Sequence, residues 1–495
     1  MCNRKCSDEV YNALYGRFGL VSKCGTACRE RGKQYLALFE ANLPASEPLL
    51  PVNQHDDADT LPQNPQVVGL DIQRRHVADP TEHDQLRRRQ STVQQTLDNL
   101  ETLYFANASL GTPPQNFRFH IDTGSSDLWA NAANSRLCRT GGNRCGISGT
   151  YSSNDSSTYQ YVNSVFNISY ADGSGASGDY ATDTFRFGSQ TVQNLQFGIG
   201  YVSQSPEGIL GIGYAINEVQ VGLAGLDPYP NLPQKLVNDG TIKSNAYSLW
   251  LNDLDASTGS ILFGGVDTEK YHGELQTLPI LPEQGSIYAE FVIEMTGMAL
   301  ISPGGRNQSL FSNQNVPVLL DSGTSLTYLP NTVANAIFQE FNTQYESSLG
   351  AAQVDCNAAN QQGSLDFNFS GVHISVPYNE LVITSQIIRG RALCILGIAP
   401  LLNGVAILGD TFLRSAYVVY DLDNNEISLA QTNFNATKTS IQEIKKGAEG
   451  VPNASGAPNA PASSTGAAMP AITANAWLGG AAALGAGAFA GFNGF

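Results

Sequence analysis

Residues 119–129 read FHIDTGSSDLW. Apolar residues lead into Asp122, four small residues with three hydroxyl groups follow it, and apolar character returns at Leu128 and Trp129. This pattern indicates a buried strand that ends in a tight turn carrying a carboxylate. A single copy is equally consistent with an ordinary hairpin turn, because Asp and Gly are common turn formers.

A second copy of the pattern lies in the distal half of the chain, as VLLDSGTS at residues 318–325. Each copy is followed at nearly the same distance by Ile-Leu-Gly, at residues 209–211 and 407–409. Similar turns at similar spacing mark an internal repeat, so we predict two similar lobes.

Between about residues 100 and 432, short apolar or aromatic runs alternate with turns of Gly, Asn, Asp and Ser. This alternation predicts an all-β fold. One segment, residues 331–345, has helical spacing instead.

If the two lobes face each other, Asp122 and Asp321 meet across a cleft. Two carboxylates at hydrogen-bond distance cannot both ionise easily, so one holds a proton while the other stays charged. The charged member can take a proton from water, and the protonated member can donate to a carbonyl oxygen. This arrangement predicts direct attack of water on an amide, which needs no metal, no cofactor and no covalent intermediate.

The residues beside each aspartate fit that role. Gly124 and Gly323 let the backbone approach the carboxylates closely, which a Cβ would hinder. Ser125 and Thr324 place hydroxyl groups where they can donate to the outer carboxylate oxygens. We therefore predict that these four residues support the pair.

Other chemistries fit the sequence less well. The formal net charge of −17 disfavours nucleic acid as a partner, because nucleic-acid binding needs clustered basic residues. None of the six histidines has metal-ligand spacing, and we interpret His120, on the strand that leads to Asp122, as a packed strand residue. Gly211 and Gly213 lack the third glycine of a dinucleotide-binding loop.

DTGSS at 122–126 and DSGTS at 321–325, each followed by its hydrophobic-glycine motif, resemble the pepsin family of aspartic endopeptidases. The resemblance covers about residues 100–432. It implies a bilobal fold of two pseudo-twofold-related β-barrel-like lobes with the active-site cleft between them, and Asp122 and Asp321 as the catalytic pair. The implied peptidase domain is 90–435, with an N-lobe at about 100–285 and a C-lobe at about 286–432, acting on protein and peptide substrates.

YADGSG at 170–175 resembles the hairpin flap of that family. The resemblance implies that Tyr170, Asp172 and Gly173 close over substrate and that the indole of Trp129 bonds the hydroxyl of Tyr170. An acidic residue at the position of Asp172 occurs in fungal members and is associated with accepting Lys or Arg before the cut. The alternative is a non-catalytic pepsin-like binding protein, but such proteins usually lose an aspartate or a neighbouring hydroxyl, and here all are present.

Cysteines and sequons favour a secretory route. The body carries two expected local disulfides, Cys138–Cys145 and Cys356–Cys394. The expected glycosylation sites are the seven asparagines that stand in N-x-S/T sequons: Asn107, Asn154, Asn167, Asn307, Asn368, Asn435 and Asn453.

Residues 1–65 do not fit this scheme, because they lack the apolar core that a signal peptide needs. Their first part carries two C-x-x-x-C motifs, formed by Cys2, Cys6, Cys24 and Cys28, which resemble those of small mitochondrial intermembrane-space proteins. A separate Cys-rich module or metal site is one interpretation. We favour a mis-joined first exon in place of a signal peptide.

Residues 66–89 end in Arg87-Arg88-Arg89, which predicts a pro-segment removed by a dibasic-specific processing protease. The product would be an enzyme made as a zymogen. The loop around Cys138–Cys145 is short, so we do not expect further cleavage into two chains.

After Glu449 no charged residue occurs. We expect a low-complexity stalk at 436–475 and a weakly hydrophobic tail at 476–495, which is typical of a GPI-attachment signal, with attachment at Gly466. A disordered tail is the alternative. The whole layout resembles the fungal yapsin-like, GPI-anchored branch, and it implies a monomer held by the lipid at the outer face of the plasma membrane or in the wall.

Overall fold

The computed structural model describes residues 66–75, 103–139, 144–170, 174–256, 258–283, 286–388, 391–401 and 404–458. The chain divides into two compact units, one of Met1–Asn64 with Pro282–Ile287, and one of Pro65–Leu281 with Tyr288–Phe495. Of the smaller unit, the structure describes Pro282, Glu283, Ser286 and Ile287. There the backbone N–H of Glu283 donates to the carbonyl of Ile287. Both lobes and the active site lie in the larger unit.

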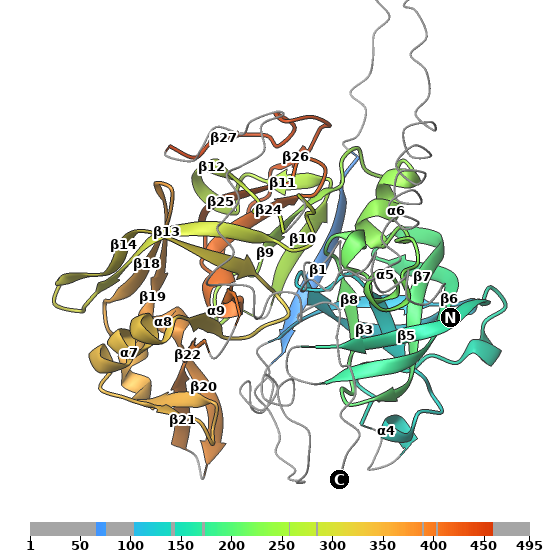
Figure 1. The fold of residues 1–495 in the computed structure, drawn as a ribbon, viewed down its shortest axis with the longest axis horizontal. Helices are drawn as coiled ribbons and strands as arrows, with labels where there is room; N and C mark the ends of the chain where they lie inside the picture. The colour runs from blue at the N-terminus through green and yellow to red at the C-terminus, as the bar shows by residue number, and fades with distance from the viewer. Residues whose placement is uncertain are drawn as a thin grey trace, which may run out of the picture. The chain divides into compact units, whose positions relative to one another are not determined.

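The larger unit is built mainly from strands, as the sequence predicts (Figure 1). A 14-stranded sheet runs through it. Its strands, in spatial order, are β27 (Ala454–Gly456), β12 (Tyr271–Pro279), β25 (Glu426–Thr432), β24 (Ala416–Asp421), β9 (Ala246–Trp250), β10 (Thr258–Phe263), β1 (Val68–Arg75), β2 (Leu103–Leu110), β3 (Gln115–Asp122), β8 (Gly208–Gly211), β4 (Leu128–Asn131), β7 (Gln190–Ser203), β6 (Gly175–Phe187) and β5 (Gln160–Ser169).

Three smaller sheets complete the strand content. The seven-stranded sheet of the C-lobe contains β19 (Val372–Pro377), β18 (Ser364–Phe369), β13 (Val292–Ile301), β14 (Asn307–Leu320), β23 (Ala406–Leu408), β15 (Thr327–Leu329) and β22 (Ile398–Pro400). The others are β16 (Tyr345–Glu346), β17 (Ala351–Val354), β21 (Arg391–Leu396) and β20 (Val382–Ile388), and the pair β11 (Gly265–Asp267) and β26 (Ile441–Glu443).

Helices are short. They are α4 (Arg136–Arg139), α5 (Val219–Ala224), α6 (Leu232–Asn238), α7 (Asn331–Glu340), α8 (Tyr378–Leu381) and α9 (Asp410–Leu413). The helix predicted at 331–345 is present but ends at Glu340, and Asn342 takes a positive φ that an α-helix does not allow.

The internal repeat in the sequence corresponds to the same pattern of strand pairing in each lobe. In the N-lobe, β3 pairs in parallel with β8, and β4 pairs antiparallel with the same strand. In the C-lobe, β14 pairs in parallel with β23, and β15 pairs antiparallel with it. Each aspartate motif therefore ends a strand whose neighbour is the following Ile-Leu-Gly strand.

One apolar core supports both copies of the repeat. Ile121 and Leu210 of the N-lobe and Leu320 and Leu408 of the C-lobe are fully buried and belong to the same cluster. Burying such side chains contributes roughly 1.5–3 kcal/mol each, so the strands that carry the turns are firmly held.

Two segments outside the predicted peptidase domain join its sheets. β1 lies between β10 and β2, and its alternate residues Val68, Leu70 and Ile72 are buried. At the other end, where the stalk is expected from residue 436, β26 pairs with β11 and β27 pairs with β12. Ile444 is fully buried, so an apolar anchor holds this part to the body as far as the described residues extend.

Both predicted disulfides are present. Cys138 bonds Cys145 beside α4, and Cys356 bonds Cys394 of β21. Each closes a local loop within one lobe, with sequence separations of 7 and 38 residues.

Candidate active site

The two aspartates occupy equivalent places. Asp122 is the last residue of β3, and Asp321 directly follows β14. Both side chains are buried, with 2% and 8% of their surface exposed. The apolar ends of the two strands place the carboxylates at the turns without exposing them widely to water.

Each carboxylate is held by its own turn in the same way. The backbone N–H of Gly124 donates to Oδ1 of Asp122 over 2.8 Å, and the Ser125 hydroxyl donates to Oδ2 over 2.5 Å. The N–H of Gly323 donates to Oδ1 of Asp321 over 2.7 Å, and the Thr324 hydroxyl donates to Oδ2 over 2.6 Å. Each side chain is thus held at both oxygens, so both carboxyl groups have fixed orientations.

Reciprocal hydrogen bonds join the two turns. The N–H of Thr123 donates to the Ser322 hydroxyl, and the N–H of Ser322 donates to the Thr123 hydroxyl. The Thr123 hydroxyl donates to the carbonyl of Leu320, and the Ser322 hydroxyl donates to the carbonyl of Ile121. All four bonds are buried, and they fix one lobe's turn against the other's.

The glycines show how closely the two carboxylates converge. A Cβ built on Gly124 would lie 2.7 Å from Oδ1 of Asp321 in the opposite lobe. A Cβ built on Gly323 would overlap Oδ1 of Asp122 and lie 3.0 Å from Oδ1 of Asp321. The two Oδ1 atoms are therefore the inner pair, facing each other, and the two Oδ2 atoms are the outer pair, bonded to hydroxyl groups.

The Ile-Leu-Gly strands lie directly behind the turns. The N–H of Gly213 donates to the carbonyl of Ser125, and the N–H of Asp410 donates to the carbonyl of Thr324. A Cβ on Gly211 would lie 2.6 Å from the backbone nitrogen of Asp127, so only glycine fits there.

The hydrogen bond expected between Trp129 and the flap tyrosine is present in the structure. Nε1–H of Trp129 donates to the hydroxyl of Tyr170 over 2.7 Å. Tyr170 and Ser174 close the described ends of the hairpin through a backbone bond of 2.9 Å. Asp172 and Gly173 lie outside the described residues.

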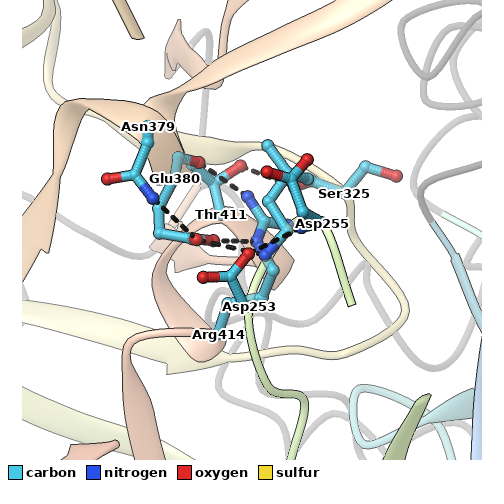
Figure 2. Close-up of polar contacts among 8 residues, drawn as sticks. Asp253, Asp255, Ser325, Asn379, Glu380, Thr411 and Arg414 are labelled. Atoms are coloured by element: carbon cyan, nitrogen blue, oxygen red, sulfur yellow. Dashed lines mark hydrogen bonds and ion pairs between the residues drawn. The ribbon is translucent and has the colours of Figure 1, made fainter. Parts of the chain in front are cut away.

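The structure adds an ion pair that sequence reasoning missed. Figure 2 shows Arg414, which follows α9, beside Glu380 of α8. Nε of Arg414 donates to Oε2 of Glu380 over 2.5 Å, and both side chains are fully buried. Burial raises the pKa of Glu380, and the charge of Arg414 opposes that rise.

The short helix α9, which Arg414 follows, also forms a hydrogen bond with the catalytic turn of the C-lobe. The Thr411 hydroxyl, three residues before Arg414, donates to the carbonyl of Ser325 over 2.8 Å (Figure 2). The only signal in the sequence was an arginine that follows Phe412 and Leu413 shortly after Ile-Leu-Gly, and nothing in it identified the partner at position 380.

The predicted sequons differ in accessibility. Four of them carry exposed asparagines within or near strands of the two lobes: Asn107, Asn154, Asn167 and Asn307. Asn435 is also exposed, at a positive φ. Asn453 is exposed as well, and its Nδ2 donates to the Tyr271 hydroxyl, whereas Asn368 is half-buried and accepts from the N–H of Gly371.

Within the described residues, no cluster of three His, Cys, Asp or Glu side chains could hold a metal ion. No described helix is long and apolar enough to span a membrane. Gly466 and residues 476–495, predicted to carry the anchor signal, lie outside the described residues, as do the four cysteines of the first segment.

Known proteins resemble the chain over most of its length. Residues 103–432 match the family described as eukaryotic aspartyl protease. The chain is 56% identical over 396 residues to the probable aspartic-type endopeptidase opsB of Aspergillus oryzae, a match that covers 79% of this chain and 81% of that protein. It is 37% identical over 361 residues to aspartic proteinase yapsin-3 of Saccharomyces cerevisiae, covering 70% of each.

The fold also has a match among solved structures. The aspartic proteinase from Irpex lacteus aligns with a TM-score of 0.57 at 22% identity, over 76% of this chain and all of that one. This likeness and the repeated topology confirm the predicted bilobal, mostly β fold. The chain thus belongs to the eukaryotic aspartyl protease family, in its yapsin-like fungal branch, and is an aspartic-type endopeptidase.

Proposed function

We propose that this endopeptidase hydrolyses peptide bonds at acidic pH with a water activated between Asp122 and Asp321. It is made as a zymogen on the secretory route and held at the cell surface by a GPI anchor. It accepts Lys or Arg before the cut. One observation carries the catalytic part: two oriented carboxylates converge on one point from two lobes, each with a hydroxyl on its outer oxygen.

In this mechanism the water lies between the inner oxygens. The charged carboxylate takes a proton from the water as the water oxygen attacks the amide carbon, and the protonated carboxyl donates its proton to the carbonyl oxygen, which gives a tetrahedral diol. The carboxyl that gained the water proton then donates it to the amide nitrogen, the C–N bond breaks, and a hydroxyl of the diol returns its proton to the other carboxylate as the C=O bond forms. Because Ser125 and Thr324 hold the outer oxygens, the inner oxygens keep their orientation throughout.

Substitution of one catalytic aspartate tests the catalytic proposal. Asp122→Asn keeps the shape of the turn but removes the shared proton chemistry, so it should fold, reach the surface and lose cleavage of casein at about pH 4–5. Asp227→Asn, a change at an exposed aspartate, is the matched control and should retain pepstatin-sensitive cleavage. Equal activity of Asp122→Asn and the control would contradict the proposal.

The zymogen proposal is supported by the arginines that end residues 66–89 and precede the family match at residue 103. N-terminal sequencing of the secreted protein should give Gln90. Replacement of Arg87, Arg88 and Arg89 with alanine should leave a longer, less active form. An unchanged N-terminus in that variant would contradict cleavage after Arg89.

The anchor proposal is supported by the uncharged C-terminal sequence and by the resemblance to yapsins. Phospholipase C specific for phosphatidylinositol should release the enzyme from cells. A chain that ends after residue 458 keeps β26 and β27, and it should appear in the medium with full activity. Retention of that shorter chain on cells would contradict the proposal.

The preference for Lys or Arg is supported by Asp172 in the flap sequence, because a carboxylate near the substrate favours a cationic side chain. Matched peptides with Lys or Leu before the cut should be compared for wild type and Asp172→Thr. We expect the ratio of kcat/KM for Lys over Leu to fall about tenfold in the variant, which corresponds to about 1.4 kcal/mol. An unchanged ratio would show that Asp172 does not determine the preference for Lys or Arg.

A further inference from the structure

A second pair of carboxyl groups lies behind the catalytic turn of the N-lobe. Asp127 directly precedes β4 and is 1% exposed. Its carboxylate accepts three hydrogen bonds, from the Tyr180 hydroxyl at 2.5 Å, the Tyr229 hydroxyl at 2.8 Å and the N–H of Val219 at 2.9 Å. Burial raises the pKa of Asp127, and these three donors oppose that rise.

Glu218 is the other member of this pair. It directly precedes α5 and is also 1% exposed. Its Oε2 accepts from the N–H of Tyr229 over 2.8 Å, and its Oε1 is buried with no hydrogen-bond partner among the described residues. Burial, followed by the charge of Asp127, raises the pKa of Glu218 to about 10. Asp127 accepts three hydrogen bonds and Glu218 accepts one, so of the two acids Glu218 is the one that retains a proton.

The pair connects three parts of the N-lobe. Asp127 belongs to the turn that carries Asp122, Tyr180 lies on β6, which returns from the flap, and Val219 and Tyr229 lie in the segment around α5 (Figure 1). A buried ion in this position is stable only while its donors stay in place, because an unpaired buried charge is costly.

A chain of aromatic contacts continues from the pair to the flap tyrosine. Tyr180 packs edge-on against Phe166, with ring centroids 5.2 Å apart, and Phe166 packs against Trp129 at 6.3 Å. Trp129 in turn donates its N–H to Tyr170. Displacement of Tyr180 would therefore disturb the support of the flap.

We propose that Asp127 and Glu218 are positioning residues: the hydrogen bonds to Asp127 fasten β6 and the α5 segment to the catalytic turn and so support the flap, and a proton on Glu218 keeps a second negative charge out of this buried site. The inference rests on the active site described above. It goes beyond that site because neither residue touches the catalytic carboxylates in any contact of the described structure.

The direction of the pH effect follows from the groups that face Glu218. These are Asp127 from the catalytic turn, Tyr180 from β6 and Tyr229 from the segment after α5, and none of them supplies a positive charge. In the unfolded chain Glu218 loses its proton near pH 4.3, whereas the folded protein retains it. Stability is therefore fully present below that pH and declines as the pH rises, because unfolding then releases a proton.

Glu218→Gln tests the inference, because glutamine has the shape of the protonated acid and cannot ionise. Thermal unfolding is measured at pH 4 and pH 7 for wild type, Glu218→Gln and the exposed control Glu274→Gln. We expect Glu218→Gln alone to raise the unfolding temperature at pH 7 and to leave it unchanged at pH 4. Superimposable temperatures for all three proteins at both pH values would overturn the inference.

The kinetic parameters kcat and KM distinguish a positioning role from a contribution to stability alone. Each protein's kcat and KM are measured at pH 4. Glu218→Gln should keep KM within about twofold of the wild-type value, whereas Glu218→Ala, which removes the acceptor for the N–H of Tyr229, should raise KM about fivefold or more with a smaller change in kcat. A KM for Glu218→Ala equal to that of the control Glu274→Gln, or a loss carried only by kcat, would overturn the inference.

A second variant covers the other half of the pair. Asp127→Asn should raise KM more than it lowers kcat, and Asp127→Glu should restore less than half of the loss because the longer side chain displaces Tyr180. A loss carried only by kcat would overturn the positioning role. Failure of wild type to cleave casein would instead reject the proposed function, and the unfolding temperatures would still decide the inference.

Discussion

At the scale of single residues, the active site depends on the absence of side-chain atoms as much as on the carboxylates themselves. Gly124 and Gly323 each leave the space into which the opposite aspartate projects. The sequence motif indicated that glycine lets the backbone approach a carboxylate. It could not show that the carboxylate in question belongs to the other lobe, because that contact joins residues almost 200 positions apart.

We predict that Gly323→Ala abolishes most activity. The added methyl group would overlap Oδ1 of Asp122, and a misplacement of about 1 Å in a catalytic group can cost about 100-fold in rate. Gly304→Ala is the control, because a Cβ there meets no atom within 4 Å. The measurement is kcat on a peptide substrate; equal values for the two variants would contradict the predicted overlap.

At the scale of elements, the strands and turns of the repeat could be predicted because their signals are local. Alternating apolar residues predicted the strands, and the two motifs predicted their turns. The buried pairs of Arg414 with Glu380 and of Asp127 with Glu218 could not be predicted in this way. Each joins residues from different elements, and no spacing in the sequence marks one partner for the other.

The same limit applies at the chain ends. Residues from 436 onward are weakly patterned compared with the body, and their composition indicates the beginning of a stalk. Burial of Ile444 and the pairing of β26 and β27 are tertiary contacts, which local composition does not reveal.

We predict that α8 and α9 are held together by the buried ion pair. Arg414→Met leaves Glu380 as an uncompensated buried charge, so the free energy of unfolding should fall by about 3–5 kcal/mol. Arg414→Met with Glu380→Leu should recover much of that loss, because a well-packed apolar pair can replace a buried ion pair. Urea unfolding at pH 6 measures both; a double variant no more stable than Arg414→Met would contradict the explanation.

At the scale of the whole molecule, buried acids set how stability varies with pH. Burial raises the pKa of several carboxyl groups in the described residues, namely Asp127, Glu218, Glu294, Glu380, Asp421 and Glu426. Burial acts to raise the pKa of Glu443 as well, but hydrogen bonds from Lys243 and from the N–H of Gln66, with the nearby lysine charges, together outweigh it and lower that pKa. Raised values predominate, so the folded protein binds more protons than the unfolded chain above about pH 4.3.

We predict that the unfolding temperature is highest near pH 4 and falls toward pH 7. Glu426 contributes through burial and the neighbouring charge of Asp421, which raise its pKa to about 7. Its contribution is complete below the unfolded value and is lost as the pH rises to 7. Glu426→Gln should raise the unfolding temperature at pH 7 by roughly 2 °C and leave it unchanged at pH 4. Calorimetry checks this, and a wild-type protein more stable at pH 7 than at pH 4 would contradict it.

The reciprocal bonds between Thr123 and Ser322 have a consequence for biosynthesis. While the chain emerges from the ribosome, Asp122 appears long before the turn that completes its site. Neither the second carboxylate nor the hydroxyl that fixes Thr123 exists until residues 321 and 322 have been made. A nascent chain, or one truncated before that point, therefore carries half of the catalytic apparatus without its counterpart, and it cannot cleave peptides until the second turn has been made and has folded against the first.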